Sequence, residues 1–338
     1  MLGSLVDHGG ALLKFVFLNS IDDYWLEKLA YLKQRFSEDS FITGRDHPDS
    51  CELIEEADAL ITGRLSVEDL KRAKRLKVIF VPWTGVNNLP LHSLRERGVI
   101  VSNNHGNAAI VAERAIALAL AVTGRIVYLH NEMGRGIWPG RTDDRDPSWF
   151  SIQGKTCAIL GLGQIGIRIA KMLKAFGCEV LGYRKDLSRG KPDHVDLLVD
   201  SFQDAIKRSE VVFLAMPLTD DTRGLIGEDV LKSMQDKFLV NISRGEIVDE
   251  KALFKALKDG TLSGAAIDTW YNYPSRKRPI AFPSKYPVHT LPNIVMSPHV
   301  ASWTPEGIRL MVDETVKSIE SYILRGRPLY EVDLDLEY

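Results

Sequence analysis

The stretch TCAILGLGQIGIRIAKMLKAFGCEVLGYR, residues 156–184, constrains the fold of this chain more than any other. It begins with a short apolar, β-prone run, and apolar residues then recur at helical spacing until Gly177 ends the helix. A second β-prone run follows over residues 179–183. About 30 residues therefore predict a complete βαβ unit, which is the building block of a parallel sheet.

Three glycines separate the first strand of this unit from its helix. Gly161 allows a tight turn, Gly163 lets the backbone approach a pyrophosphate, and Gly166 lets the helix pack closely on the strand. The helix N-terminus, with Gln164 and Ile165, offers free N–H groups and a positive dipole end to phosphates. In this strand–turn–helix context the motif predicts a dinucleotide site at these residues, and a glycine-rich surface turn is the alternative.

The end of the second strand indicates which dinucleotide binds. NAD-specific sites of this type place Asp or Glu there for the ribose 2′-hydroxyl, whereas this chain has Arg184, followed by Lys185, Ser188 and Arg189. Cations and a hydroxyl suit a 2′-phosphate, because guanidinium pairs bidentately with phosphate oxygens. We therefore predict NADP in preference to NAD, with Arg184 and Lys185 as contacts. The alternative is that Arg184 stacks on adenine without selecting either cofactor.

Length and composition exclude several classes of protein. With 338 residues and 45% hydrophobic content, the chain can build two domains with a core in each. A net charge of −2 and a pI near 6.5 argue against nucleic-acid or membrane-surface partners. No apolar run approaches the roughly 18 residues of a membrane span, and the first residues lack the cationic start of a secretory signal, so we expect a cytoplasmic protein.

Neither the cysteines nor the histidines form a ligand pattern. Cys51, Cys157 and Cys178 are far apart and lack CxxC spacing, so we expect three small buried side chains in a reducing compartment. The histidines do not form HExxH or a comparable motif. No metal site is therefore predicted.

The remaining segments alternate short strands with helices. Strands are expected at 14–19, 59–62, 77–82 and 99–103, and later at 211–217, 238–245 and 263–270; helices are expected at 24–35, 67–74, 89–97, 201–209, 227–234 and 249–259. The pattern predicts an α/β protein with two Rossmann-like, doubly wound parallel sheets. Residues at the carboxyl ends of the strands should then line the ligand sites.

Two further segments carry specific expectations. The turn WTGVNN, residues 83–88, follows the strand at 77–82, and Gly85 would let backbone N–H groups face an anion. We predict that Gly85 and Val86 contact a substrate carboxylate, with a plain loop as the alternative. The segment 108–129 is apolar nearly all round, which predicts one long buried helix.

Four motifs, in this order, closely resemble the D-2-hydroxyacid dehydrogenase family, which includes phosphoglycerate dehydrogenases, glyoxylate reductases and formate dehydrogenases. They are LGLGQIG, NISRGEIVDE at 241–250, GAAIDTW at 264–270 and LPNIVMSPHVASWT at 291–304. The resemblance implies a discontinuous, flavodoxin-like substrate domain, 1–103 with 300–338, around a dinucleotide-binding Rossmann domain, 104–299. It also implies a homodimer that transfers hydride between NAD(P)H and a small-molecule carboxylic acid, a 2-oxo or D-2-hydroxy acid.

The resemblance assigns roles to individual residues. Arg244 would bind the substrate carboxylate and polarise the adjacent carbonyl, a task suited to a permanently charged guanidinium. His299 would exchange the proton, because imidazole titrates near neutral pH. Asp268 would bond the nicotinamide carboxamide. Weaker candidates for lining the cofactor are Pro217, Thr222 and Ser243.

One position departs from the family pattern. Most members carry, five residues after the Asp, a Glu that bonds the catalytic His and raises its pKa, but this chain has Tyr273 there, followed by Pro274. No Asp or Glu occurs between Asp268 and Glu306 that could replace it. A neutral phenol cannot stabilise imidazolium as a carboxylate does. We therefore expect His299 to be largely neutral at pH 7, suited to accept a proton from an alcohol or to orient the substrate.

This departure leaves two alternatives to 2-oxo acid reduction open. The formate dehydrogenases have an amide in the Glu position and need no acid for their hydride transfer, so oxidation of a small anion such as formate is one. The other is a dinucleotide-sensing binding protein similar to the C-terminal-binding corepressors, in which an altered His partner would be tolerated.

Overall fold

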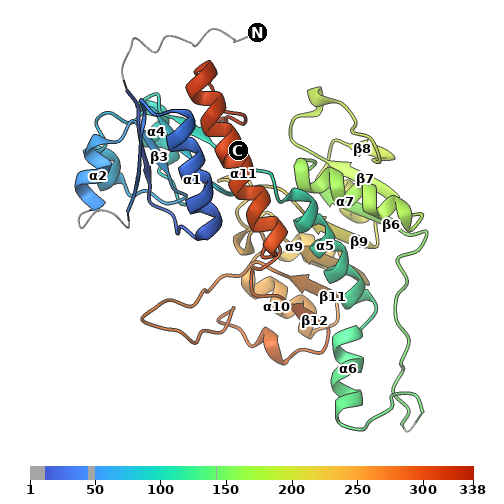
Figure 1. The fold of residues 1–338 in the computed structure, drawn as a ribbon. Coiled ribbons are helices and arrows are strands. Elements are labelled where there is room, and N and C mark those ends of the chain that lie inside the picture. The colour runs from blue at the N-terminus through green and yellow to red at the C-terminus, as the bar shows by residue number, and fades with distance from the viewer. Residues whose placement is uncertain (1–11, 45–49, 142) are drawn as a thin grey trace. The chain divides into compact units, whose positions relative to one another are not determined.

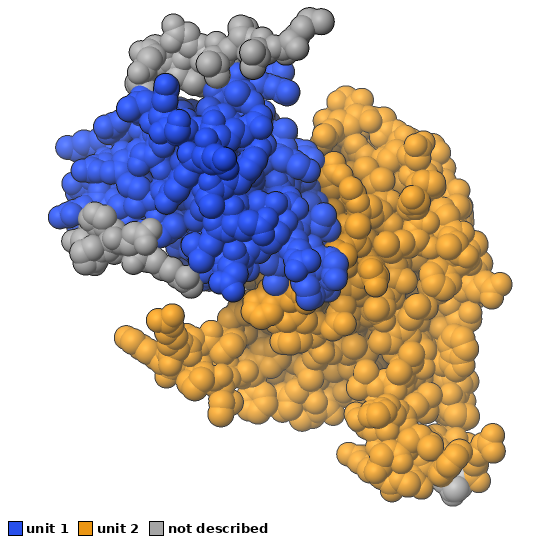
Figure 2. Space-filling view, viewed as in Figure 1, with its two compact units in different colours: residues 1–107, 304–338 blue, residues 108–303 orange. Residues whose placement is uncertain are grey.

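The computed structural model describes residues 12–44, 50–141 and 143–338. The chain divides into two compact units, coloured separately in Figure 2. Unit 1 comprises Met1–Asn107 and Thr304–Tyr338, and unit 2 comprises Ala108–Trp303. The chain therefore leaves unit 1 once and returns to it for its last helix.

Unit 1 contains a five-stranded sheet, and all its strands are parallel (Figure 1). The strands are β1 (Lys14–Phe17), β2 (Ser40–Thr43), β3 (Ala59–Ile61), β4 (Val78–Phe80) and β5 (Ile100–Ser102), in the order β2-β1-β3-β4-β5. The helices are α1 (Asp23–Arg35), α2 (Ser50–Glu56), α3 (Val67–Arg72), α4 (Leu91–Glu96) and α11 (Pro305–Arg325). This strand order is that of a flavodoxin-like doubly wound fold. The predicted fold class is confirmed, although β2 and α2 were not predicted.

The last helix of the chain completes the core of unit 1. Thr304 caps α11 by accepting the N–H of Gly307 at 2.9 Å, and Pro305 follows in the first turn, where its missing N–H costs nothing. The Tyr322 ring on α11 meets the Phe80 ring edge-on at 5.9 Å. Residues 304–325 thus belong to the fold of the first hundred residues despite their distance in sequence.

Unit 2 contains a seven-stranded parallel sheet. Its strands are β6 (Thr156–Leu160), β7 (Glu179–Tyr183), β8 (Leu197–Val199), β9 (Val211–Leu214), β10 (Lys237–Asn241), β11 (Leu262–Ile267) and β12 (Ile294–Met296), in the order β12-β11-β10-β9-β6-β7-β8. The helices are α5 (Ala108–Thr123), α6 (Ile126–Gly134), α7 (Gln164–Ala175), α8 (Phe202–Lys207), α9 (Glu228–Lys232) and α10 (Glu250–Lys258), with 3₁₀ turns η1 (Leu187–Arg189), η2 (Gly245–Ile247) and η3 (Val288–Thr290). The strand order reverses between β6 and β9, and ligands bind at such a switch point in this class of fold.

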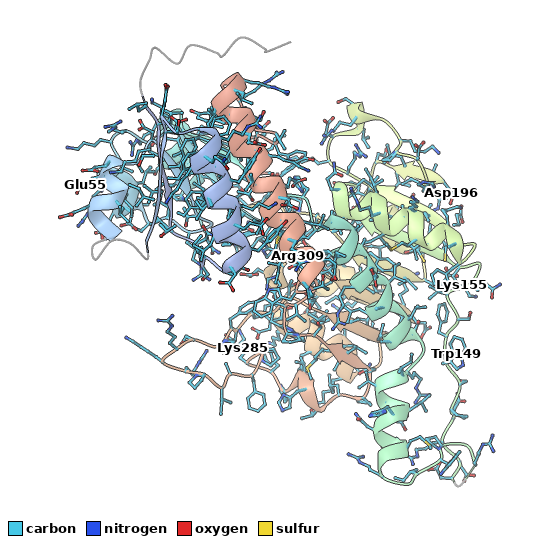
Figure 3. The ribbon with its side chains drawn as sticks, viewed as in Figure 1. Glu55, Trp149, Lys155, Asp196, Lys285 and Arg309 are labelled. Atoms are coloured by element: carbon cyan, nitrogen blue, oxygen red, sulfur yellow. The ribbon has the colours of Figure 1, made fainter. Side chains whose placement is uncertain are left out.

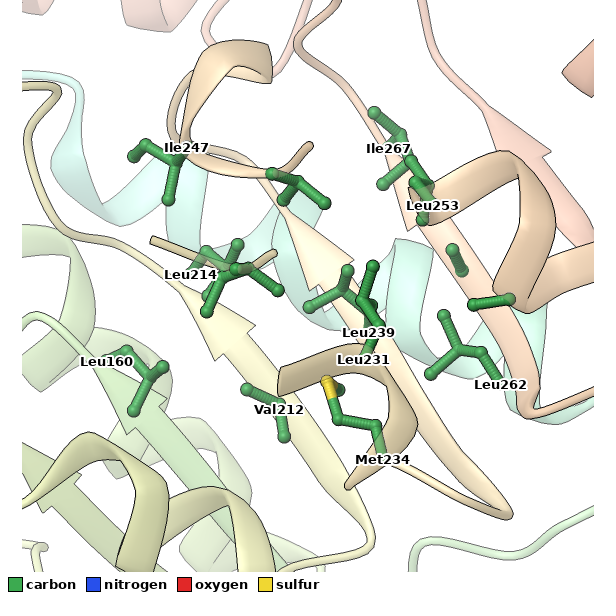
Figure 4. Packing of buried hydrophobic residues seen from close by; sticks show 14 of the residues in the cluster. Leu160, Val212, Leu214, Leu231, Met234, Leu239, Ile247, Leu253, Leu262 and Ile267 are labelled. Carbon is green, nitrogen blue, oxygen red and sulfur yellow. The ribbon is translucent and has the colours of Figure 1, made fainter. Parts of the chain in front are cut away.

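The sheet of unit 2 is buried on both faces. Along β9, Val212 and Leu214 belong to one apolar cluster, whereas Val211 and Phe213 belong to the cluster on the opposite face. This alternation follows from the two-residue period of a strand. Figure 4 shows the first cluster, in which Leu214 and its neighbours meet side chains from η2, α9 and α10. Continuous apolar strands of this kind are typical of parallel sheets covered by helices.

The prediction of one buried helix over residues 108–129 is wrong. Helix α5 ends at Thr123, Arg125 adopts a left-handed backbone with φ 50°, and α6 begins at Ile126. The Arg125 guanidinium donates to the carbonyl oxygens of Asp146 and Ser148 at 2.8 and 3.0 Å, and these tertiary bonds fix the break. The apolar pattern continues across the break, and Gly124, directly after Thr123, is a local sign of the helix end that the prediction did not use. Helix α6 and the segment after it extend away from the rest of unit 2 (Figure 1).

Among the described residues, no helix has the combination of length and hydropathy that a bilayer crossing requires.

Candidate active site

The glycine turn after β6 depends on close backbone contacts. Gly161 has φ +107°, and a Cβ atom there would lie 2.5 Å from the carbonyl carbon of Ala215, which follows β9. A Cβ atom on Gly166 would lie 2.0 Å from the carbonyl oxygen of Gly161. Gly163 differs, because nothing lies within 4 Å of its Cβ position. The first and third glycines are therefore required by packing, whereas the second borders open space.

The start of α7 leaves backbone donors available. Gly163 is the N-cap residue, and no side chain caps the helix that begins at Gln164. The Ile165 side chain packs against the core, and the Gln164 side chain accepts a hydrogen bond from Arg168 at 2.7 Å. The first-turn N–H groups and the helix dipole therefore face the switch point without a side-chain acceptor. This arrangement fits a pyrophosphate group.

The cationic side chains after β7 differ in their hydrogen-bond and ion-pair partners. Lys185 forms an ion pair with Asp221, and the Ser188 hydroxyl donates to Asp186. Arg184 is half-buried, and its Nε atom is buried without a hydrogen-bond partner among the described residues. Burial and the nearby Arg189 hold the pKa of Arg184 below its ordinary value. The buried Nε of Arg184 without a partner and the nearby positive charge of Arg189 favour an anion beside Arg184.

The predicted cofactor-lining residues after β9 and β10 hold neighbouring loops together. The Thr222 hydroxyl donates to the Pro217 carbonyl oxygen at 2.7 Å and accepts the Thr219 N–H at 2.8 Å. The Ser243 hydroxyl donates to the Met216 carbonyl oxygen. In this ligand-free chain both hydroxyls therefore act on the backbone that borders the switch point. Their contact with a cofactor stays a prediction.

Arg244 directly precedes the 3₁₀ turn η2 and is held by its neighbours. The Asn241 side-chain amide donates to the Arg244 carbonyl oxygen at 2.9 Å, and one guanidinium nitrogen donates to the Ser243 carbonyl oxygen at 2.7 Å. No carboxylate of the described residues lies within ion-pair distance of this guanidinium, and burial lowers its pKa. A half-buried cation with unused donors is suited to bind an anion. Asn241, which holds the Arg244 backbone, was not singled out from the sequence.

Asp268 is almost fully buried and binds the loop that follows β12. Its carboxylate accepts the Ser297 hydroxyl and the N–H groups of Val300 and Ala301, the latter two at 3.1 Å. In the same loop, His299, directly before Val300, has φ +58°, a left-handed backbone that is uncommon outside glycine. The loop contacts explain how this backbone is maintained. The predicted bond from Asp268 to a nicotinamide stays a prediction.

Tyr273 contacts His299 directly. The Tyr273 hydroxyl oxygen lies 2.9 Å from His299 Nδ1, and the same oxygen accepts the Trp270 N–H at 3.0 Å. Partial burial, followed by the nearby Arg244 guanidinium, lowers the pKa of His299, and burial raises the pKa of Tyr273. The lowered pKa of His299 agrees with the sequence-based expectation of a largely neutral imidazole. The tyrosine therefore takes the place beside the imidazole that the family gives to a carboxylate.

The turn predicted to bind a substrate carboxylate lies in unit 1. The Val86 side chain packs into the core of that unit and is 3% exposed, so it can offer a ligand only its backbone. Gly85 has no positive φ. The turn is tied down by Thr84, whose hydroxyl donates to the Asn104 carbonyl oxygen at 2.9 Å. Contact of Gly85 and Val86 with substrate stays a prediction.

Other reactive groups do not form a second centre. In the part of the chain that the structure describes, no three His, Cys, Asp or Glu side chains are grouped as metal ligands. Cys157 and Cys178 are fully buried, and the neighbouring Cys178 thiol, together with burial, raises the pKa of Cys157. The side chain of Cys51 lies outside the described residues.

The fold and this site define an oxidoreductase of the Rossmann class, and comparison with known proteins identifies its family. The model for the NAD-binding domain of D-isomer specific 2-hydroxyacid dehydrogenases matches residues 116–301. A glyoxylate reductase of Thermococcus litoralis is 32% identical over 80% of this chain and 82% of its own length. The chain therefore belongs to the D-isomer specific 2-hydroxyacid dehydrogenase family.

Two further proteins are similar to the chain, one in sequence and one in structure. A D-3-phosphoglycerate dehydrogenase of Methanocaldococcus jannaschii is 31% identical over 84% of this chain, which spans only 53% of that protein. Among solved structures, an acyclic imino acid reductase in complex with NADPH and D-Arg has a TM-score of 0.78 and 25% identity, over 95% of this chain and all of that one.

Proposed function

We propose that this protein reduces small 2-oxo acids to D-2-hydroxy acids with NAD(P)H, glyoxylate being the smallest candidate. The observation that carries the proposal is that, within the described residues, the Arg244 guanidinium of unit 2 has no carboxylate at ion-pair distance, while its charge lowers the pKa of His299 in the same unit. An anionic group on the guanidinium brings the adjacent carbonyl toward the imidazole. The relatives named glyoxylate reductase support this substrate class.

In this proposal, individual residues have separate binding and catalytic roles. A nicotinamide dinucleotide supplies the hydride, and the glycine turn with the start of α7 binds its pyrophosphate. Arg244 grips the carboxylate and polarises the carbonyl, and His299 exchanges the proton with the carbonyl oxygen. Unit 1 serves as the substrate domain, with the backbone N–H groups of Gly85 and Val86 as further carboxylate contacts. Unit 2 serves as the dinucleotide domain.

NADP is the preferred cofactor in this proposal. The unpartnered, buried Nε of Arg184 and the adjacent Arg189 are suited to a ribose 2′-phosphate, which would accept charge-assisted hydrogen bonds from them. Lys185 contributes less, since Asp221 already neutralises it. The structurally similar imino acid reductase was solved with NADPH, in line with this preference.

The proposal is tested by a panel of 2-oxo acids with NADH and NADPH in parallel, following the loss of reduced-nicotinamide absorbance at about 340 nm. Turnover of glyoxylate or a related acid, lost in Arg244→Gln, is the expected result. Formate is included with the oxidised cofactors, because Tyr273 leaves the site without the family carboxylate. NADPH binding without turnover of any acid would indicate a dinucleotide-sensing protein instead.

We also propose that the protein is a homodimer that pairs through unit 2. Helix α6 and the segment after it carry large apolar side chains with substantial exposure: Ile126 57%, Val127 42%, Met133 45%, Trp138 47% and Trp149 62%. With Phe150, Val127 and Trp149 border a groove beside the end of α5, and Figure 3 labels Trp149 on the returning segment. Exposed apolar surface of this extent is typical of an interface between subunits. A second copy of the chain is its proposed occupant.

A further inference from the structure

The hydrogen bonds of the Tyr273 hydroxyl have a definite direction. The Trp270 backbone N–H can only donate, so the Tyr273 oxygen accepts from it. The hydroxyl still has one proton to donate, and His299 Nδ1 at 2.9 Å is its only acceptor among the described residues. If Nδ1 carried a proton instead, the phenolic oxygen would receive two donors and its own proton would have no acceptor. The contacts therefore favour an Nδ1 atom without a proton.

We propose that Tyr273 is a positioning residue that fixes His299 as the neutral tautomer with its proton on Nε2. The role of this tautomer in catalysis rests on the proposed function. The tautomer itself follows from the Trp270–Tyr273–His299 hydrogen bonds of the ligand-free chain.

The proposal gives Nε2 a defined task. An Nε2–H group donates a hydrogen bond, and a carbonyl oxygen accepts one, so this tautomer binds the 2-oxo form of a substrate. A carboxylate at position 273 would act differently, because it accepts a proton from Nδ1 and favours imidazolium. The sequence-based expectation that neutral His299 accepts a proton from an alcohol requires the opposite tautomer. The proposed tautomer is compatible with the other expectation, that His299 orients the substrate.

The charges around the pair agree with two neutral rings. Arg244 faces both side chains, Asp268 faces both from the end of β11, and Glu246 faces Tyr273 from η2. Burial followed by Arg244 lowers the pKa of His299, while burial raises the pKa of Tyr273. The lowered pKa of His299 disfavours imidazolium, and the raised pKa of Tyr273 disfavours phenolate. Near neutral pH the two rings therefore share one hydrogen bond between uncharged groups.

The same hydrogen bond provides a second proton during reduction. As a hydride reaches the carbonyl carbon, the carbonyl π electrons move to oxygen, and this oxygen takes the proton of Nε2. The electrons of the broken N–H bond stay in the ring, which takes the Tyr273 proton at Nδ1. The imidazole remains neutral, and the negative charge resides on the phenolic oxygen beside the Trp270 N–H and within the field of Arg244. After the product leaves, water gives a proton to Nε2 and releases hydroxide to the bulk solvent, while Nδ1 returns its proton to the phenolate, so that the starting tautomer is restored.

The tautomer is measured without turnover, by ¹⁵N NMR of the full-length, ligand-free chain labelled at histidine, with His299→Gln to assign the resonance among the 8 histidines. A protonated Nε2 and an unprotonated Nδ1 at pH 7.5 are expected in the unchanged protein. Tyr273→Phe should shift His299 toward a mixture of tautomers. The control is Tyr271→Phe, which removes a hydroxyl bound to the Val248 carbonyl oxygen and not to His299. A proton on Nδ1 in the unchanged protein, or an unaltered tautomer in Tyr273→Phe, would overturn the proposal.

The proton relay is measured separately, in single turnovers with a 2-oxo acid that the substrate panel identifies. Two protons in motion give a curved dependence of the rate on the D₂O fraction, and Tyr273→Phe should make it linear while lowering the rate about tenfold to a hundredfold. A linear dependence in the unchanged protein contradicts the relay. Failure of the proposed function would instead appear as no turnover with any acid, and the NMR result would still decide the tautomer.

Discussion

The Asp268 carboxylate accepts the backbone N–H of Ala301 at 3.1 Å and so connects the end of β11 to the loop that carries His299. A residue expected to bind the cofactor thus also fixes the backbone of the catalytic candidate. Because three donors of this loop converge on one buried carboxylate, its removal should loosen the loop before it affects the sheet.

Asp268→Asn should lower the free energy of unfolding by about 1–3 kcal/mol, because the amide turns an N–H toward a backbone N–H and leaves buried groups unsatisfied. Amide hydrogen exchange at Val300 and Ala301 should accelerate in the folded protein. Asp200→Asn, an exposed change in the same unit, is the control for the loss of a carboxylate. Unchanged exchange at both amides would show that the carboxylate does not hold the loop.

Gly166→Ala and Gly163→Ala should separate packing from cofactor binding. The new methyl group at residue 166 would lie 2.0 Å from the Gly161 carbonyl oxygen, so we expect a loss of about 1–3 kcal/mol in stability, measured by denaturant unfolding. At residue 163 the methyl group meets nothing within 4 Å, so the stability loss should stay below about 1 kcal/mol. Gly163→Ala should nevertheless weaken dinucleotide binding at least tenfold. Normal binding by this variant would contradict a pyrophosphate at the turn.

Arg184→Ala should weaken NADPH binding and leave NADH binding nearly unchanged. Loss of charge-assisted hydrogen bonds to a 2′-phosphate corresponds to about a tenfold to hundredfold rise in Kd. Fluorescence titration with both cofactors measures the difference. Arg208→Ala removes an exposed guanidinium that pairs with Asp204 on α8, and it controls for net charge. Equal effects on both cofactors would argue that Arg184 does not select between them.

Tyr273→Glu should raise the pKa of His299. In the unchanged protein, burial followed by the nearby Arg244 guanidinium holds the pKa of His299 below its ordinary value, which favours the neutral imidazole. A carboxylate beside Nδ1 stabilises the imidazolium, and we expect the midpoint of an NMR titration to rise by about one to three pH units. The acid limb of the pH–rate profile should move in the same direction. Tyr273→Gln, which introduces no charge, should leave the midpoint low.

Trp149→Glu should dissociate the proposed dimer, because it places a charge in the groove bordered by the end of α5 and the segment 148–150. Light scattering after size-exclusion chromatography measures the mass of the particle. Ile280→Glu, at a side chain that is 87% exposed on the loop between β11 and β12, is the matched control and should not alter the mass. A monomeric unchanged protein would refute the pairing.

Much of the fold could be predicted because its signals are local. The glycine turn, the buried strands and the parallel order all follow from residue spacing within about 30 residues. The strands β2 and β8 were not predicted, because β2 contains only two apolar residues, Phe41 and Ile42, and the three apolar residues of β8 are flanked by Asp196 and Asp200. The break at Arg125 follows Gly124, but the hydrogen bonds of Arg125 to residues 146 and 148 are contacts that no local pattern reveals.

The sequence indicates candidate site residues, but it does not indicate the contacts among them. Arg244, Asp268 and His299 follow from motifs, and Tyr273 was recognised as a departure. The bond from Asp268 to the His299 loop and the contact of Tyr273 with His299 join residues 32 and 26 positions apart, which no local pattern reveals. The burial of Val86 was missed because a loop position gives no period from which to infer it.

The parallel direction of all strands in unit 2 determines where a label can be attached without blocking the ligand site. Every strand of this sheet ends at the edge where the glycine turn, Arg244 and Asp268 lie, so the residues that start the strands lie at the opposite edge. Gln153 is exposed just before β6, a strand that spans about 17 Å. A linker to a bead, an electrode or a fluorescent reporter attached at Gln153 would therefore leave the ligand edge unobstructed.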